Sequence, residues 1–257
     1  MDITIDNVKS YWNNQPCNVK HSDKEVGTFE YFEEVSAKRY TAEPHIPEFA
    51  KFNDCEGKDV LEIGCGIGTD GVEFLKSGAN YTATELSEKS ADIARKRFDV
   101  YGYDVDIHVG NSEKLCDFLP ENQYDVIYSF GVIHHTPNPD KVFSKIKKYL
   151  KDDGVLRIML YAKDSWKGYM IDEGLDQPEA QYGCPIANMY TKEEVVNLLS
   201  DYDVTSIKQD HIFTYKIPEY KQGLFVKEPW FENMNDKVFS AMKKHLGWHL
   251  LIEAKLK

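Results

Sequence analysis

The chain has 257 residues, of which 42% are hydrophobic and 29% charged, and its formal net charge is −12 at pH 7. This composition is typical of a globular protein with room for one large α/β domain, and the acidic balance argues against general nucleic-acid binding. No signal peptide, bilayer-length apolar run or C-x-x-C pair is visible among the five scattered cysteines. These features predict a cytoplasmic protein with no membrane partner, no nucleic-acid partner and no metal site.

Strand and helix patterns alternate through residues 58–160, which form the predicted core. Asp70 and Glu73 stand where a capping box would open the first helix of this core. Strands alternating with helices predict a parallel sheet with helices on both faces. The predicted elements are a strand at Asp59–Gly64, a helix at Thr69–Lys76, a strand at Tyr81–Glu85, a helix from Ser87 to Tyr101, strands at Asp106–Val109 and Tyr124–Phe130, a helix at Pro139–Leu150 and a strand at Val155–Tyr161.

The C-terminal part has a different pattern. A helix is predicted at Thr191–Leu199, followed by strands at Val204–Thr214 and Trp248–Leu256 without a full helix between them. The predicted fold is therefore a single α/β domain, residues 1–257, with a doubly wound, mostly parallel seven-stranded sheet and a terminal antiparallel hairpin. Residues 1–50 form an N-terminal cap segment. Residues 163–190 and 215–247, rich in aromatic residues, Gly and Pro, are predicted to be irregular binding insertions.

A glycine-rich turn follows the first core strand, in the order Glu62-Ile-Gly64-Cys-Gly66-Ile-Gly68. Glycine permits a tight turn out of a strand and a close approach of the backbone to a ligand, and the next helix begins with free N–H groups. Glu85 ends the second strand, 21 residues after Gly64, where a carboxylate can accept hydrogen bonds from the ribose of a nucleoside. Strand, turn, helix and acid together predict a nucleoside-containing cofactor.

A nicotinamide or flavin cofactor would use the same geometry, so a nicotinamide-dependent oxidoreductase is an alternative. Two residues favour S-adenosylmethionine instead. Dinucleotide fingerprints place Gly or Ala at the position of Thr69, for close packing of helix on sheet. Glu62 would repel a pyrophosphate but suits a positively charged amine and sulfonium.

Three segments resemble the class I S-adenosylmethionine-dependent methyltransferases: VLEIGCGIGTDGVEFLKSGA, YTATELSEKS and YDVIYSFGVIHHTPNPDKVFSKIKKYLKDDGVLRIM. The resemblance covers about residues 58–160 and is greatest to the small-molecule branch of the family. It implies that the glycine turn lines the methionine part of the cofactor, that Glu85 holds the ribose and that Leu86 packs on the adenine. Asn111, where the family often has Asp, would recognise the adenine edge. The cofactor-binding residues so implied are Glu62, Gly64, Cys65, Gly66, Gly68, Glu85, Leu86, Asn111, Ser112, Glu113 and Phe130.

Other residues are candidates on the acceptor side of the reaction. His134, in a His134-His135 pair after the fourth strand, is the candidate catalytic base and substrate contact, although the pair could instead only shape its loop. Tyr11 on an N-terminal helix is expected to close over the cofactor, or to pack on the core. Arg39 is expected to bind the cofactor carboxylate or an acidic acceptor, with a solvated arginine as the alternative.

Aromatic residues in the two insertions are further candidates for acceptor binding, through stacking or cation–π contacts. Packing within a lid is the alternative for at least half of them. The predicted function is methyl transfer from S-adenosylmethionine to a nitrogen or oxygen of a small-molecule metabolite. A non-catalytic S-adenosylmethionine-binding protein is a further alternative. The predicted substrate-binding residues are His134, Tyr161, Trp166, Tyr169 and Trp230.

Overall fold

The computed structural model describes residues 3–176, 183–220, 222 and 224–257, which build one sheet of eight strands. The strand order is β3-β2-β1-β4-β5-β8-β7, with β6 beside β5 off this path. Strands β1 to β6 pair in parallel, whereas β8 runs antiparallel to both β5 and β7. The strands are β1 (Asp59–Ile63), β2 (Asn80–Glu85), β3 (Ile107–Val109), β4 (Tyr124–Phe130), β5 (Leu150–Ala162), β6 (Met189–Tyr190), β7 (Tyr202–Asp210) and β8 (His249–Leu256).

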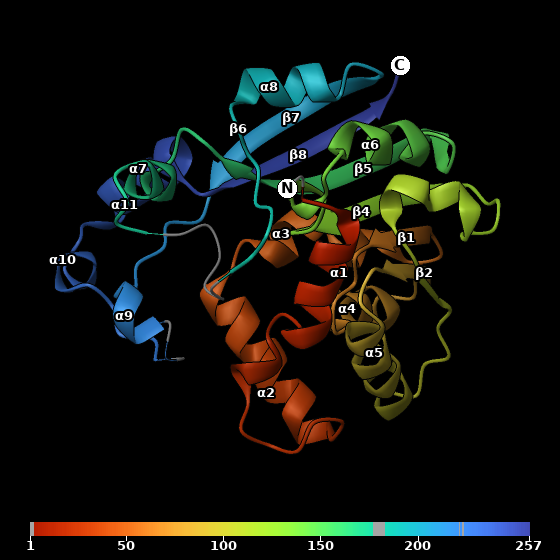
Figure 1. Cartoon of the computed structure of the whole chain (residues 1–257), viewed down its shortest axis with the longest axis horizontal. Coiled ribbons are helices and arrows are strands. Elements are labelled where there is room, and N and C mark those ends of the chain that lie inside the picture. The colour runs from red at the N-terminus through yellow and green to blue at the C-terminus, as the bar shows by residue number, and fades with distance from the viewer. Residues whose placement is uncertain (1–2, 177–182, 221, 223) are drawn as a thin grey trace.

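Helices cover both faces of this sheet (Figure 1). On one side lie α3, α4 and α5, and on the other lie α6 and α8. The α-helices are α1 (Ile5–Asn14), α2 (Phe29–Ala42), α3 (Ile46–Ala50), α4 (Thr69–Lys76), α5 (Glu88–Val100), α6 (Pro139–Ile146), α7 (Trp166–Asp172), α8 (Lys192–Leu198), α9 (Ile217–Tyr220), α10 (Pro229–Glu232) and α11 (Asp236–Leu246). Short 3₁₀ turns are η1 (Val19–His21), η2 (Phe52–Cys55), η3 (Ser112–Asp117) and η4 (Ile133–His135).

Two hydrophobic clusters, one on each face, form the core. Successive residues of a strand point to opposite faces, so Val60 packs with Phe74 and Phe98 of α4 and α5, while Leu61 packs with Phe143 of α6. Both faces are therefore apolar, as expected for a sheet covered by helices on both sides.

The fold class predicted from the sequence is confirmed, including the antiparallel pair, here β7 and β8. The eighth strand is the two-residue β6, which the sequence pattern did not separate from its loop. The predicted helix to Leu150 is too long, because α6 ends at Ile146 and the Tyr149 carbonyl already accepts a 2.7 Å hydrogen bond from the Tyr124 N–H. The predicted strand at Val155–Tyr161 is too short, because β5 already begins at Leu150.

The insertions contain more regular structure than predicted. Residues 163–190 carry α7 and β6, and residues 215–247 carry α9, α10 and α11. The helix α11 contacts β7, so a helix does separate the two antiparallel strands in sequence. None of its eleven residues is buried, so α11 adds no side chain to the core.

The N-terminal segment folds against the glycine turn. Tyr31, Phe32 and Val35 of α2 form a buried cluster with Ile67 of the turn and Ile93 of α5. This cluster holds the N-terminal helices at the edge of the sheet where the parallel strands end, on the lower side of Figure 1.

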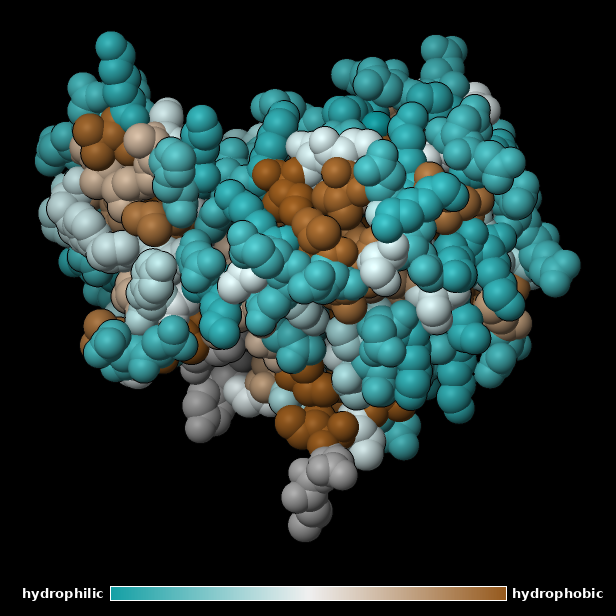
Figure 2. Space-filling model, turned by 90° about the horizontal axis from the view of Figure 1, so that it is seen from above, coloured by the Kyte–Doolittle hydropathy of each residue, from teal (hydrophilic) through white to brown (hydrophobic). Residues whose placement is uncertain are grey.

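The outer surface is polar over the face that carries α6 and α8. Seen from above, this face is mostly hydrophilic, with hydrophobic side chains in small groups (Figure 2). Within the described residues, no helix combines the length and apolar character needed to cross a bilayer. The apolar sides of α6 and α8 are thus directed at the sheet, and the antiparallel strand β8 contributes to the same buried cluster.

Because β8 lies inside the sheet, shortening a buried side chain on it should destabilise the whole protein. Ile252 is fully buried and pairs with Ile158 of β5. Ile252→Ala is expected to lower the free energy of unfolding by about 2–5 kcal/mol, measured by urea denaturation. Val238→Ala on α11, where the side chain is 52% exposed, should change it by less than about 0.5 kcal/mol. Equal losses in the two variants would contradict the placement of β8.

Candidate functional site

A cavity of about 260 Å³ lies beyond the carboxyl ends of the parallel strands. One end is lined by the glycine turn and the residues that follow β2 and β3, and the other by residues that follow β4, β5 and β7. Ligands of doubly wound sheets bind at this edge, because the loops after parallel strands meet there. The cavity is therefore the candidate functional site, and its lining can be compared with the predicted residues.

The glycine turn has the backbone that its sequence requires. Gly64, Gly66 and Gly68 have φ angles of 78°, 55° and 77°, which residues with a side chain rarely adopt. A Cβ atom on Gly64 would clash with the Val132 side chain, whereas a Cβ on Gly66 would meet nothing within 4 Å. Gly66 therefore leaves its backbone open to the cavity. Gly68 does not line the cavity but is the N-cap residue of α4.

Glu85 lines the cavity at the end of β2 and is held by the turn itself. Its carboxylate accepts hydrogen bonds from the N–H groups of Gly66 (2.8 Å), Leu86 (2.9 Å) and Ser87 (2.9 Å). Burial raises the pKa of Glu85, and the three N–H groups act in the opposite direction. A carboxylate has about four lone-pair positions, so about one position on Glu85 remains for a ligand. Glu85 can therefore accept a hydrogen bond from one ribose hydroxyl, but not from both.

Glu62 lines the same cavity from the end of β1, one strand away from Glu85. It is 3% exposed and accepts a hydrogen bond from the Tyr81 hydroxyl. Burial, with a further contribution from the charge of Asp70, raises the pKa of Glu62 to about 8. A buried carboxyl group at this place would become ionised at neutral pH when a cation lies beside it.

Asp70 is a cavity residue whose role the sequence did not reveal. It was predicted to cap α4, but Gly68 holds the cap position and the Asp70 carboxylate is buried. It accepts hydrogen bonds from Arg39 (3.0 Å), Tyr40 (3.0 Å) and Tyr128 (2.9 Å). Arg39 also lines the cavity, so the alternative of a solvated arginine is wrong. The partners of Asp70 are distant in the sequence, so no local sequence pattern indicated these hydrogen bonds.

The histidine pair is placed differently from the prediction. His134 is fully buried against the Tyr161 ring, with centroids 3.8 Å apart, and it does not line the cavity. Burial, with the neighbouring His135, lowers the pKa of His134 well below its usual value. His135 lines the cavity instead, and its Nδ1 lies 2.6 Å from the Ile186 carbonyl. The two rings pack edge to face with centroids 4.3 Å apart, and only that of His135 reaches the cavity.

The Nδ1 of His135 must donate its proton to Ile186, because a carbonyl oxygen can only accept. Neutral His135 therefore carries its basic nitrogen at Nε2. The buried position of His134 contradicts its predicted contact with an acceptor, and the Trp12 ring lies 5.2 Å from the His135 ring, which does line the cavity.

The remaining predicted residues divide into two groups. Tyr11 packs edge-on against Trp12 at 4.9 Å, and it is Trp12, with Ile5 and Val8 of α1, that lines the cavity. Glu113 turns away to accept hydrogen bonds from Asn138. Outside the cavity lie Tyr11, Gly68, Glu113, His134, Trp166, Tyr169 and Trp230. Lining it are Glu62, Gly64, Cys65, Gly66, Glu85, Leu86, Asn111, Ser112, Phe130, Arg39 and Tyr161.

The tertiary structure shows which aromatic residues line the cavity and which pack elsewhere. Trp166 and Trp230 pack on each other with ring centroids 5.3 Å apart, and Tyr169 is 52% exposed. The aromatic residues that line the cavity from the later part of the chain are Tyr161, Phe213, Tyr215, Tyr220, Phe225 and Trp248. Of these, Tyr161 was predicted by name, and Tyr215, Tyr220 and Phe225 lie in the predicted insertion 215–247, whereas Phe213 and Trp248 were not predicted.

The sequence spacing indicated no metal site, yet three histidines meet beside the cavity. One ligand atom from each of His45, His211 and His249 can be chosen such that all three atoms lie within 4.8 Å of one another. His211 and His249 line the cavity. The three lie in separate parts of the chain, before α3, after β7 and at the start of β8, so no short motif joins them.

Comparisons with known proteins agree with this geometry. Residues 61–156 match the family model described as methyltransferase domain. Over 113 residues the chain is 34% identical to a ubiquinone biosynthesis O-methyltransferase of Actinobacillus pleuropneumoniae, covering 41% of this chain and 47% of that protein. Over 176 residues it is 24% identical to sterol 4-C-methyltransferase strm-1 of Caenorhabditis elegans, covering 65% and 50%. The chain thus spans about half the length of these curated relatives.

Solved structures share the fold at low sequence identity. Magnesium protoporphyrin IX methyltransferase from Synechocystis with bound S-adenosylhomocysteine is 14% identical, with a TM-score of 0.61 over 97% of this chain and 98% of that one. Geranyl diphosphate C-methyltransferase from Streptomyces coelicolor is 16% identical, with a TM-score of 0.62 over 98% and 97%.

The fold and the glycine turn define an α/β domain of the nucleoside-binding class, with Glu85 at the end of the second strand. The family match makes the comparison more specific: residues 61–156 match a methyltransferase domain, and the whole fold is shared with solved methyltransferase structures.

The raised pKa of Glu62 predicts a pH dependence of stability. A carboxyl group with a folded-state pKa of about 8 binds its proton more tightly in the folded than in the unfolded state. Its stabilising contribution is complete below the unfolded pKa of about 4.3 and is lost as the pH rises through about 8. The free energy of unfolding, measured by urea denaturation between pH 5 and pH 9, should therefore fall less with pH in Glu62→Gln than in the wild type. If the free energy of unfolding falls equally with pH in Glu62→Gln and in the wild type, the raised pKa of Glu62 is contradicted.

Proposed function

We propose that this protein transfers the methyl group of S-adenosylmethionine to a nitrogen or oxygen atom of a small-molecule metabolite. The observation that carries the proposal is one cavity with two different ends. The glycine turn and Glu85 line one end, and aromatic and histidine side chains line the other. A methyl donor and its acceptor need such a shared space, because they must meet in line and away from water.

The donor end fits the cofactor through residues of several strands. Gly66 offers open backbone, and the remaining lone pair of Glu85 can accept from a ribose hydroxyl. Asn111 and Ser112 line the cavity after β3, where they can contact a base. Glu62 lies where its ionised form would attract the amine of the methionine part. S-adenosylmethionine supplies a methyl group on a sulfonium, which is already electrophilic, so the protein has mainly to bind and orient.

The acceptor end is suited to a ring compound. Phe213, Tyr215, Phe225 and Trp248 present aromatic surface, against which a flat apolar group gains stacking contacts. The Nε2 of His135 can accept a hydrogen bond from an acceptor hydroxyl or amine and so fix the direction of the nucleophile. Residues 215–247 are in this proposal a binding insertion, of which Tyr215, Tyr220 and Phe225 reach the cavity.

Binding of the cofactor product tests the donor end. Glu85→Gln keeps one oxygen and the size of the side chain but loses the charge. It is expected to weaken binding of S-adenosylhomocysteine at least about tenfold, because a hydrogen bond to a charged group contributes about 1.5–3 kcal/mol. Isothermal titration calorimetry measures the effect, with Glu88→Gln, on the exposed first turn of α5, as the control. Binding of a nicotinamide dinucleotide in place of S-adenosylhomocysteine would contradict the proposal, and so would unchanged binding by Glu85→Gln.

Methyl transfer tests the acceptor end. The wild type, incubated with a metabolite extract and S-adenosylmethionine labelled in the methyl group, should produce labelled small molecules detectable by mass spectrometry. His135→Ala should reduce their formation at least about tenfold while S-adenosylhomocysteine binds with unchanged affinity, since the hydrogen bond it removes orients only the acceptor. His108→Ala, on β3 and outside the cavity, is the control. Cofactor binding without any labelled product would indicate a non-catalytic binding protein.

A further inference from the structure

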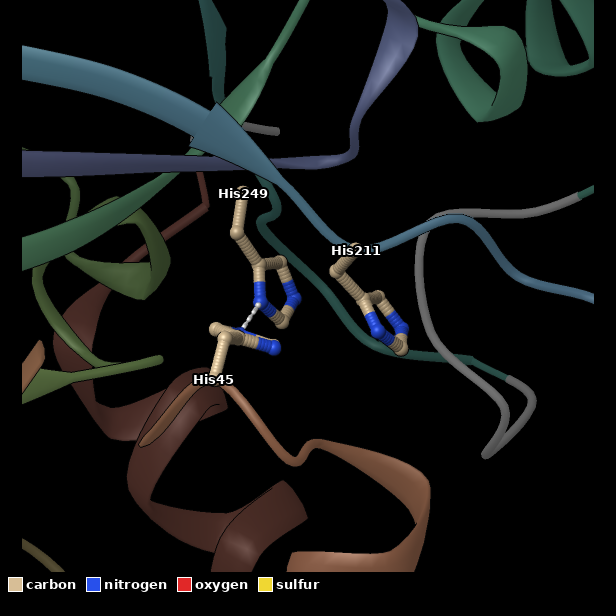
Figure 3. A group of neighbouring side chains, drawn as sticks. All are labelled: His45, His211 and His249. Atoms are coloured by element: carbon tan, nitrogen blue, oxygen red, sulfur yellow. Dashed lines mark hydrogen bonds between the residues drawn. The ribbon is translucent and has the colours of Figure 1, made fainter. Parts of the chain in front are cut away.

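Three histidines from separate segments lie side by side near the acceptor end of the cavity, and the rings of His45 and His249 face each other (Figure 3). His45 precedes α3, His211 follows β7 and His249 begins β8. The Nε2 of His45 lies 3.0 Å from the Nδ1 of His249, and one nitrogen of each ring falls within 4.8 Å of the others. This group, here called the histidine triad, takes no part in the donor end described above.

We infer that the histidine triad binds one divalent transition-metal ion of the zinc class, with an open coordination position that faces the cavity. Zinc sites that keep a position for a ligand commonly have three protein ligands, and three imidazoles are one such set. Two nitrogens bound to one tetrahedral zinc ion lie about 3.3 Å apart, because each bond is about 2.0–2.1 Å long. The 3.0 Å separation of His45 and His249 is close to this value.

The protonation state of the triad suits a metal ligand. Burial lowers the pKa of His45 to about 4 and that of His211 to about 3, and it lowers the pKa of His249 well below its usual value. All three rings are therefore neutral at pH 7, which is the form that binds a metal ion. One ring proton between His45 and His249 has to move to the opposite nitrogen when an ion enters.

One acidic side chain, Glu43, lies next to the triad. The Oε1 of Glu43 lies 3.8 Å from the Nε2 of His249, while the Nδ1 of that ring faces His45. A histidine between a metal and a carboxylate is a common arrangement, since the carboxylate orients the ring. The positive charge of Arg39, a nearby cation, is offset by two carboxylates, because its guanidinium lies 3.0 Å from Asp70 and 3.6 Å from Glu43.

On the far side of the triad, the Lys243 ammonium lies 3.3 Å from the Asp210 carboxylate. Lys167, which also lines the cavity, forms a buried ion pair with Asp176 at 3.0 Å. Each of these positive charges is therefore offset by a carboxylate, and Glu43 adds a further negative charge. The charge around the triad does not oppose entry of a cation.

The backbone at His211 is consistent with a built site. Its φ angle of 68° lies in the left-handed region, which is uncommon for a residue with a side chain. The Asp210 side chain accepts the His211 N–H at 2.6 Å, and the His211 carbonyl accepts the Trp248 N–H at 2.7 Å. These two bonds hold an unfavourable conformation in which the His211 ring stacks on the His249 ring, with centroids 4.5 Å apart. Unusual backbone held in this way is concentrated at functional sites.

The position of the triad indicates what the ion would bind. His211 and His249 line the acceptor end, and the His249 ring lies 5.5 Å from the Phe130 ring at the end of β4. An acceptor hydroxyl on the open position would lose its proton to water more readily, since a bound divalent ion lowers the pKa of its ligand. The oxygen then forms the bond to the methyl carbon, and the electron pair of the broken C–S bond stays on sulfur. This role, which rests on the proposed function, assigns the acceptor to metal-binding hydroxyl compounds.

Zinc binding is measured directly on the full chain. Protein freed of metal with a chelator is titrated with zinc sulfate by calorimetry, and one saturable site per chain is expected. His211→Asn and His249→Asn should abolish this site, and asparagine is chosen at position 211 because it tolerates the left-handed backbone. His108→Asn on β3 should bind zinc as the wild type does. Circular dichroism and the unfolding temperature establish that each variant is folded.

Two further measurements sharpen the test. Glu43→Gln should weaken zinc binding about 10- to 100-fold without removing it, as expected for a residue that positions a ligand. Cobalt(II) added to the wild type should give the intense visible absorption of a four-coordinate ion, and this band should be absent in His249→Asn. Absence of saturable zinc binding by the wild type, or binding by a folded His211→Asn at the wild-type affinity, would overturn the metal site.

The outcome separates this inference from the proposed function. Zinc titration requires neither S-adenosylmethionine nor an acceptor, and binding of S-adenosylhomocysteine requires no zinc. A protein that binds S-adenosylhomocysteine but not zinc would retain the proposed methyl transfer and refute the triad as a metal site. A protein that binds zinc at the triad but no S-adenosylhomocysteine would refute the proposed function alone. If both bind, methyl transfer should be reduced in the chelator-treated enzyme and restored by zinc sulfate, and equal transfer in both would refute the acceptor role.

Discussion

The cavity depends on the buried carboxylate of Asp70 at the start of α4. A buried charge is strongly unfavourable unless it is paired and hydrogen-bonded, and Asp70 meets this requirement through Arg39, Tyr40 and Tyr128. These partners come from α2 and β4. Satisfying one carboxylate therefore connects the N-terminal segment, the helix that follows the glycine turn and the central strand.

A second buried carboxylate illustrates how binding and stability oppose each other. Glu62 lies near Asp70, and its ionised form is unfavourable mainly because it is removed from water, while the charge of Arg39 acts in the opposite direction. A cofactor amine at this place would favour the ionised form, so the same desolvation that destabilises the empty site strengthens the attraction for the ligand. Glu85 differs, because three backbone N–H groups already stabilise its negative charge.

The two ends of the cavity differ in how they are built. The donor end consists of strand ends and a turn whose backbone is set by glycine and by hydrogen bonds to Glu85. The acceptor end consists of side chains from α1, η4 and the segments around β7 and β8. His134 supports this second end without facing it, because its ring lies against Tyr161, which in turn stacks on Trp248 at 4.3 Å. The histidine triad lies next to this aromatic stack, with Tyr161 and His249 rings 6.1 Å apart.

The sequence by itself determined the sheet, the glycine turn and Glu85, because each is encoded locally: an apolar run makes a buried strand, positive φ needs glycine, and a strand ends at a definite residue. Strand β4 and helix α4 have the predicted bounds. Only the tertiary structure decided that Asp70 binds Arg39, that His135 and not His134 faces the cavity, and that His45, His211 and His249 converge. These contacts join residues far apart in the chain, and they form only when α2 and β8 pack in their places in the fold. Local periodicity in the sequence does not predict that packing.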